Sequence, residues 1–281
     1  MNIPALRLAT ILTGALALLP PSLSSQAPPA NLPNASSAAG SVGRDTSPLN
    51  PENALEMSNP QQKAEFDLFL SVPPNQPGKK VSIGEEFLRR YPGSHYTQAI
   101  YSGLAVAYIE NGQADKGYTA GASAVRLDPN DIRTMGVLCQ SMARLYNPQQ
   151  PGSAQDLAQA EKYGKQAIDT AAALKKPAKM SDKDFQVTKD EALAMVHSGL
   201  GLVFLRKSNF TQAISELEQA VSLDSKHDPT NLYLLGVANQ NASHFDAAAQ
   251  AFTRCAASPG NLQATCKAAA ETAHKSLGKS K

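Results

Sequence analysis

The sequence predicts an all-α protein, an α-solenoid built by stacking similar pairs of antiparallel helices, and three observations predict it. Nearly the same phrase occurs twice, as AVRLDPND at 124–131 and as AVSLDSKH at 220–227, as expected if one unit recurs along the chain. Beyond Asn59 the apolar residues fall at helical spacing, in segments of about 12 to 15 residues. The composition agrees, because alanine is abundant and runs of β-branched residues that compete with helix are few.

The overall charge argues against one class of partner. The chain has 281 residues, of which 42% are hydrophobic, so it can bury a substantial core. Its 26 Lys and Arg nearly balance 24 Asp and Glu, for a formal net charge of +2. No dense basic stripe with interleaved aromatic residues occurs, so nucleic acid is not expected as a partner.

Residues 1–27 have the layout of a secretory signal peptide. Arg7 precedes an apolar run from Leu8 to Leu19, and small residues suited to cleavage follow around Ser24 to Ala27. A membrane anchor is the alternative, but the run is shorter than the ~18 apolar residues that span a bilayer. We therefore expect an exported protein, periplasmic or secreted, with no stable membrane span once the signal is cleaved.

Residues 28–59 are rich in Pro, Ser, Asn, Gly and Ala and poor in large apolar side chains. Such a segment cannot bury enough surface to offset its ordering entropy, so we expect a disordered linker, with a docking tail as the alternative. Residues 60–279 are expected to form a helical repeat domain of about five helix pairs plus a cap. Its divergent first pair would be Gln61–Leu70 and Val81–Arg90, joined by the turn NQPGKK.

The four following units share a pattern, in which a Leu and a small residue stand side by side in the first helix. The pairs are Leu104-Ala105, Leu138-Cys139, Leu200-Gly201 and Leu235-Gly236. Small residues also recur four and three apart in each second helix, as at Gly117, Gly121 and Ala124. Small side chains let two helix backbones approach closely, which a stack of helix pairs requires.

Particular residues mark the turns. Gly112 falls where the first helix of its unit must end, in the left-handed conformation that glycine tolerates. Asp128 is expected to cap the helix that follows, with Pro129 in its first turn. Insertions at 147–156 and 175–184 lengthen the inner turn and the exit of the third unit, and we expect longer helices beside them.

These positions resemble the tetratricopeptide repeat, a helix-turn-helix unit of about 34 residues. The matching residues of two units are Tyr101, Leu104, Ala105, Tyr108, Gly117, Ala124 and Pro129, then Leu200, Gly201, Phe204, Ala213, Leu217 and Ala220. Gly121 stands where the family has Phe, and the resemblance covers roughly 61–259. It implies a right-handed solenoid that binds protein or peptide partners in a concave groove lined by the first helices.

The register of this resemblance places thirteen side chains in the groove. The main candidates for binding a partner are Arg133, Gln140, Arg144, Arg206, Tyr233, Gln240 and Asn241, with Val106, Ile109, Glu110, Ser198, Leu202 and Val237 beside them. Arg and Tyr are enriched at binding hot spots. The alternative for each is an ordinary solvated residue on a helix face. The Lys and Asn that clamp a C-terminal carboxylate in some family members are absent, since Ser102, Val106, Gly136 and Gln140 stand there.

The cysteines suggest how the stack is closed. Cys255 and Cys266 flank the turn ASPGN near the facing ends of two helices, so we expect a disulfide that fastens a capping helix at Leu262–Leu277. Two buried thiols are the alternative. Cys139 stands in a small-residue position and is expected to be a buried small hydrophobe.

No pattern predicts catalysis. The sequence has no H-E-x-x-H, no G-x-S-x-G and no phosphate-binding glycine motif, and its five histidines are not at metal-ligand spacing. We expect no enzyme, no catalytic residue, no cofactor and no metal. The predicted function is an exported, non-catalytic protein-interaction scaffold of the cell envelope. An assembly factor for outer-membrane or cell-wall machinery, suggested by FLRRYPGSHY, and a receptor for a small ligand or sugar are the alternatives.

Overall fold

The computed structural model describes residues 60–279, which form eleven helices and no strand. The expected signal peptide at 1–27 and linker at 28–59 lie outside the described residues. The helices are α2 (Pro60–Ser71), α3 (Pro77–Arg90), α4 (Thr97–Glu110), α5 (Ala114–Leu127), α6 (Ile132–Leu145), α7 (Ser153–Ala173), α8 (Asp182–Arg206), α9 (Phe210–Leu223), α10 (Pro229–Asn241), α11 (Phe245–Ala256) and α12 (Gln263–Lys279).

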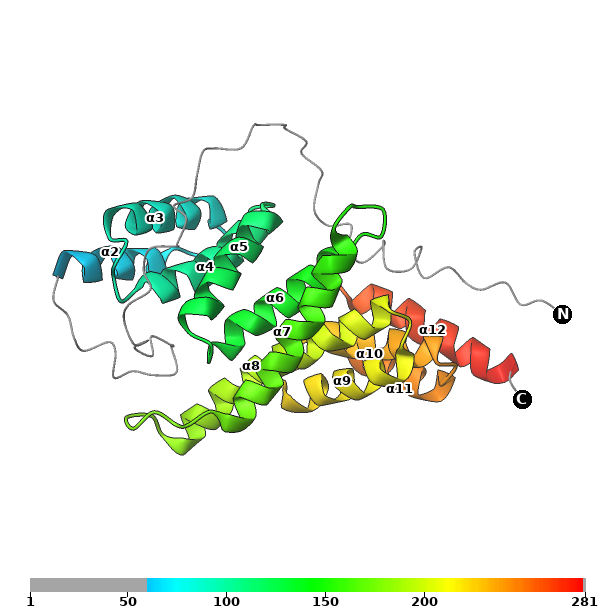
Figure 1. Ribbon diagram of the computed structural model, residues 1–281. Coiled ribbons are helices and arrows are strands. Elements are labelled where there is room, and N and C mark those ends of the chain that lie inside the picture. The colour runs from blue at the N-terminus through cyan, green and yellow to red at the C-terminus, as the bar shows by residue number, and fades with distance from the viewer. Residues whose placement is uncertain (1–59, 280–281) are drawn as a thin grey trace.

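The helices stack as antiparallel pairs in chain order, from α2–α3 to α10–α11, and α12 follows as a single helix (Figure 1). The all-α solenoid predicted from the sequence is therefore confirmed. Most helices pack chiefly on their neighbours in the chain, but α6 packs extensively on α8, the first helix of the next unit. Within the described residues, no helix is both long enough and apolar enough to cross a membrane.

The first pair differs from its expected bounds in one respect. α3 begins at Pro77, not at Val81, so Gly78 and the two lysines of the expected turn lie inside the helix. Proline suits the first helical position, because its missing N–H is one that a helix start leaves unpaired in any case. The turn between α2 and α3 is accordingly 72–76.

Three units end their first helix in the same way. Gly112 has a φ of +74°, as predicted, and Ser208 and Ser243 occupy the equivalent turn positions with φ of 57° and 63°. In each turn the next amide N–H bonds back into the last helical turn, for example from Gln113 to the Tyr108 carbonyl at 2.8 Å. Two serines therefore adopt a conformation that favours glycine.

The expected cap at Asp128 is wrong, because α6 begins later than its sequence suggested. Asp131 is the N-cap, and its side chain accepts a hydrogen bond from the Thr134 N–H. Asp128 instead accepts a hydrogen bond from the Asn130 N–H, which forms the turn that contains Pro129. The expected Asp-Pro arrangement occurs one hundred residues on, where Asp228 caps α10 and Pro229 opens it.

The helix that follows each insertion is lengthened, as expected, whereas α6, which precedes the first insertion, is not. α7 has 21 residues and α8 has 25, whereas α6 and α9 have 14 each. The C-terminal end of α7, the N-terminal end of α8 and the loop 174–181 between them project beyond the neighbouring helices (Figure 1). This projection brings additional residues of α8 alongside the start of α6.

The buried apolar residues form two clusters, not one. The first extends from Phe69 to Ala120, and the second from Val125 to Ala273. Between them, Leu138 of α6 packs where a Cβ at Gly121 would stand.

Hydrogen bonds complete the boundary between the two clusters. The buried Gln98 donates to Asp131 Oδ2 at 2.7 Å, and the Ser102 and Thr134 hydroxyls lie 2.5 Å apart. The third and later units are thus joined to the first two by these hydrogen bonds as well as by the apolar contact of Leu138.

α12 closes the C-terminal end. Its Cys266, Ala270 and Ala273 are buried against α11, while most of the residues between them are exposed. The Sγ atoms of Cys255 and Cys266 lie at disulfide distance, 1.99 Å. A cap of this kind needs one apolar face and one polar face, and α12 has both.

Candidate functional site

Two glycines bring α6 and α8 into close contact. A Cβ at Gly199 of α8 would lie 2.8 Å from the Gln140 backbone nitrogen of α6, and one at Gly136 would lie 3.1 Å from Val196. Cys139 fills the seam, since its Sγ would lie 2.8 Å from that same Gly199 Cβ. The first helices of the third and fourth units therefore lie directly side by side.

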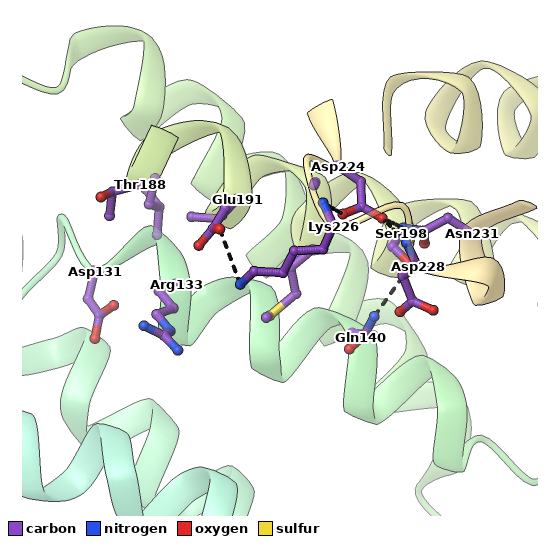
Figure 2. Close-up of a pocket in the computed structure, with 14 residues that line it drawn as sticks. Asp131, Arg133, Gln140, Thr188, Glu191, Ser198, Asp224, Lys226, Asp228 and Asn231 are labelled. Atoms are coloured by element: carbon purple, nitrogen blue, oxygen red, sulfur yellow. Dashed lines mark hydrogen bonds and ion pairs between the residues drawn. The ribbon is translucent and has the colours of Figure 1, made fainter. Parts of the chain in front are cut away.

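Beside this seam lies a cavity of about 280 Å³, which we call the α6–α8 groove. It is bounded by α6, by the lengthened part of α8 and by the turn between α9 and α10 (Figure 2). Its lining residues are Asp131, Ile132, Arg133, Gln140, Thr188, Glu191, Ala192, Ala194, Met195, Ser198, Asp224, Lys226, Asp228 and Asn231. The groove is thus mixed, with an apolar floor of alanine, isoleucine and methionine and a charged rim.

Two polar contacts cross the groove between different elements, and both are drawn in Figure 2. Gln140 Nε2 of α6 donates to Ser198 Oγ of α8 at 3.3 Å. Lys226 Nζ, from the α9–α10 turn, lies 3.1 Å from Glu191 Oε1 of α8. The lysine and glutamate side chains are 74% and 39% exposed, so this ion pair contributes little to stability and can open readily.

The three aspartates of the groove hold backbone in place. Asp131 and Asp228 cap α6 and α10. Asp224 Oδ1 accepts a hydrogen bond from the Lys226 N–H at 2.9 Å, and Asp224 Oδ2 accepts one from the Asp228 N–H. The sequence predicted none of these as groove residues.

Only two of the seven main predicted groove residues line this cavity. Arg133 is exposed at the start of α6, and Gln140 is half-buried in its middle. Arg144 is exposed at the C-terminal end of α6, outside the lining. Ile109, one of the accompanying candidates, packs within its own unit where a Cβ at Gly117 would stand, 2.6 Å from it.

The guanidinium of Arg206, which the repeat register placed in the groove for binding a partner, is already hydrogen-bonded to the end of α6. Its Nε donates to the Ala143 carbonyl and its Nη2 to the Arg144 carbonyl, both at 3.3 Å, and its guanidinium lies 5.9 Å from the Tyr146 ring centre. Partial burial lowers the pKa of Arg206 below its ordinary value. Arg206 therefore supports the C-terminal end of α6, whose last carbonyls lack partners within the helix.

The three predicted residues of α10 lie outside the groove as well. Tyr233 is buried, 5% exposed, with its ring 5.8 Å from that of Phe252. Gln240 and Asn241 are half-buried, and Asn241 Nδ2 donates to the Val237 carbonyl of its own helix at 2.8 Å. Tyr233 is buried because α8, α9 and α11 all pack against α10.

The sequence register missed the residues that complete the groove. Thr188 and Glu191 come from the part of α8 that lies beyond a normal repeat, and Lys226 and Asp228 come from an inter-unit turn. The insertion at 175–184 was the available signal, because lengthening α8 was expected from it. A repeat register assigns no groove position to such an extension.

The groove offers contacts for binding and holds no nucleophile beside a base. Cys139 lies buried in the α6–α8 seam, and burial raises the pKa of its thiol to about 12, so the thiol stays protonated. Within residues 60–279, no three His, Cys, Asp or Glu side chains are placed to hold a metal ion.

Comparison with known proteins agrees with this architecture. The tetratricopeptide repeat family matches residues 196–227, which include the end of α8 and the whole of α9. No curated protein matches the sequence significantly. A solved thermophilic TPR protein of Thermus thermophilus is similar in structure, with a TM-score of 0.54 and 16% identity over 76% of this chain and 98% of that chain. The MamA RS-1 ArsTM double mutant is similar at TM-score 0.48 and 16% identity, over 70% of this chain and 93% of that one.

The stacked helix pairs define a helical-repeat protein, a class that presents an extended surface to partners. Within it, residues 196–227 match one tetratricopeptide repeat, and the fold is similar to that of a solved TPR protein.

Proposed function

We propose that this protein is a non-catalytic interaction scaffold, exported to the cell envelope, that binds a segment of a partner protein in the α6–α8 groove. The observation that carries the proposal is the groove, where two neighbouring first helices and an inter-unit turn surround a cavity of about 280 Å³. Such stacked repeats use the surface lined by their helices for binding. The groove is open to solvent at Arg133 and Lys226, so a segment of a partner can enter it there.

A protein segment suits this groove better than a sugar or a small apolar ligand. A receptor for such ligands needs an enclosed, mostly apolar pocket with few polar groups, commonly of about 300–1,000 Å³. The α6–α8 groove falls just below that range, is open to solvent, and is lined by six charged residues. An assembly factor for outer-membrane or cell-wall machinery is a narrower form of the same proposal, which the identity of the partner would decide.

Export is supported by the pattern of residues 1–27 and by the cysteine pair, because disulfides persist in oxidising compartments. It is tested by fusing residues 1–59 to a reporter enzyme that is active only outside the cytoplasm. We expect activity, and loss of activity when Leu12→Arg interrupts the apolar run. An inactive fusion made in full amount would contradict export.

Partner binding is tested by photo-crosslinking in cells, with the probe amino acid in place of Thr188, which lines the groove. The matched control places the probe at Thr119, an exposed threonine on α5 outside the groove, whose hydroxyl bonds its own helix as that of Thr188 does. A discrete protein adduct from position 188 and none from position 119 is the expected result, and mass spectrometry then names the partner. Equal adducts at both positions, or none at either, would contradict the groove as the binding surface.

A further inference from the structure

We infer that the α6–α8 groove selects partner segments that carry an acidic side chain, and that Arg133 binds this side chain. The inference rests on the proposed function, since it assumes that the groove binds a protein segment. Of the six charged residues that line the groove, Arg133 alone has no hydrogen bond or ion pair within the described residues.

The carboxylates of the groove are all engaged. Asp131 accepts hydrogen bonds from the Thr134 N–H at 2.9 Å, from the Thr134 hydroxyl at 2.6 Å and from Gln98 Nε2 at 2.7 Å. Asp224 accepts three hydrogen bonds in the α9–α10 turn, and Asp228 accepts one from the Thr230 N–H at 2.8 Å. Because Asp131 and Asp228 cap helices, their negative charge is also offset by the helix N-termini that they face.

The remaining carboxylate, Glu191, is paired with Lys226 at 3.1 Å, and this pair spans the groove as a neutral unit. In the view of Figure 2 the Lys226 side chain lies between Arg133 on α6 and Asp228 at the start of α10. The pair is exposed and weak, so an incoming segment can displace it.

Arg133 is the exception. It is exposed, and within the described chain it makes no hydrogen bond and no ion pair, unlike the other five charged residues of the rim. It stands second in α6, where a cation faces the positive end of the helix and is mildly unfavourable. A guanidinium binds a carboxylate through two parallel hydrogen bonds, so an Asp or Glu of the partner can pair with Arg133. The negative charge of that carboxylate also interacts favourably with the positive end of α6.

The test is affinity selection of a display library of random dodecapeptides on the immobilised full chain. Four variants are compared with the unaltered chain: Arg133→Gln, Arg133→Glu, the matched control Arg126→Gln, and Thr188→Trp, which fills the groove. The readout is the enrichment of Asp and Glu in the selected peptides over the input library. Circular dichroism confirms that each variant keeps its helix content.

We expect the unaltered chain and Arg126→Gln to enrich one acidic position by about tenfold, as a bidentate charge-assisted pair should. Arg133→Gln should lose this enrichment, and Arg133→Glu should replace it with enrichment of Lys and Arg. Acidic enrichment that survives in Arg133→Gln, or peptides that are lost in Thr188→Trp but show no charge preference, would overturn the inference alone. Peptides that bind Thr188→Trp as well as the unaltered chain, or the absence of any selected peptide, would overturn the proposed function with it.

Discussion

Arg206 of α8 donates a hydrogen bond to the carbonyl of Ala143, sixty-three residues earlier, and so ties the C-terminal end of α6 to the next unit. A second hydrogen bond reaches the Arg144 carbonyl. Hydrogen bonds from charged donors contribute about 1.5–3 kcal/mol each, less where they are partly exposed. We expect Arg206→Ala to lower the free energy of unfolding by about 1–2 kcal/mol, measured by urea denaturation.

Arg144 provides the matched control, because only its backbone carbonyl takes part and its side chain is exposed. Arg144→Ala should change the free energy of unfolding by no more than about 0.5 kcal/mol. If the two variants were equally stable, Arg206 would be a solvated side chain and not a support for α6.

Two serines in left-handed turns give a stabilising prediction. Ser208 and Ser243 have φ of 57° and 63°, at the position where another unit has Gly112. The left-handed conformation costs a residue with a Cβ roughly 1–2 kcal/mol, and glycine avoids this cost. Glycine also loses more conformational entropy on folding, which cancels part of the gain. Ser208→Gly and Ser243→Gly should each stabilise the protein by about 0.5–1 kcal/mol in thermal unfolding.

The turn serine Ser225 serves as a control, since it has no positive φ. Ser225→Gly should leave the unfolding temperature unchanged or lower it. The reverse substitution Gly112→Ser should destabilise by a similar amount. A fall in unfolding temperature for both Ser208→Gly and Ser243→Gly would show that the left-handed conformation of these two serines costs no stability.

Gly199 is expected to tolerate no side chain. An added Cβ would lie 2.8 Å from the Gln140 backbone nitrogen, and a backbone cannot move aside as a side chain can. Gly199→Ala should therefore destabilise by about 2 kcal/mol through overpacking, although Ala in place of Gly ordinarily stabilises a helix by ~1 kcal/mol. Gly93→Ala, with nothing within 4 Å of its Cβ, should be neutral. Urea denaturation of both variants checks the contrast, and an unchanged Gly199→Ala would contradict the close α6–α8 contact.

The buried thiol of Cys139 predicts both low reactivity and an alkaline loss of stability. Burial raises its pKa from 9.0 to about 12, so at pH 9 iodoacetamide should label it only after unfolding in urea. Well below pH 9 the thiol is protonated in both states and contributes no pH dependence. Between pH 9 and 12 the unfolded thiol ionises first, so the free energy of unfolding should fall as pH rises.

Cys139→Ala is the comparison that isolates this effect from other alkaline titrations. Its stability should fall less steeply between pH 9 and 12 than that of the unaltered chain. Rapid labelling of Cys139 in the folded protein, followed by mass spectrometry, would contradict its burial.

Much of the fold could be predicted because the repeat depends on contacts between residues that are close in the sequence. The small residues at Gly117 and Gly121, the turn at Gly112 and the insertion before α8 each act through neighbouring residues or the next helix. Such contacts follow from spacing alone. The cap of α6 was misplaced at Asp128 for a local reason too, since Asp128 and Asp131 both suit an N-cap and only the turn geometry selects between them.

The groove was harder to predict because it depends on distant residues. The register gave Arg206 and Tyr233 the correct helices, but their surroundings are set by the end of α6 and by Phe252 of α11. The partners Glu191 and Lys226 come from an extension and a turn, to which a repeat pattern assigns no role. Helix positions follow from periodicity, whereas the exposure of a given side chain follows from how many helices surround it.

The boundary between the two apolar cores lies next to the α6–α8 groove. One core ends at Ala120 and the other begins at Val125, so α5 contributes to both. The hydrogen bond from Gln98 to Asp131 crosses the same boundary. Because Asp131 also lines the groove, a change in packing between the two cores acts directly on the residues of the groove.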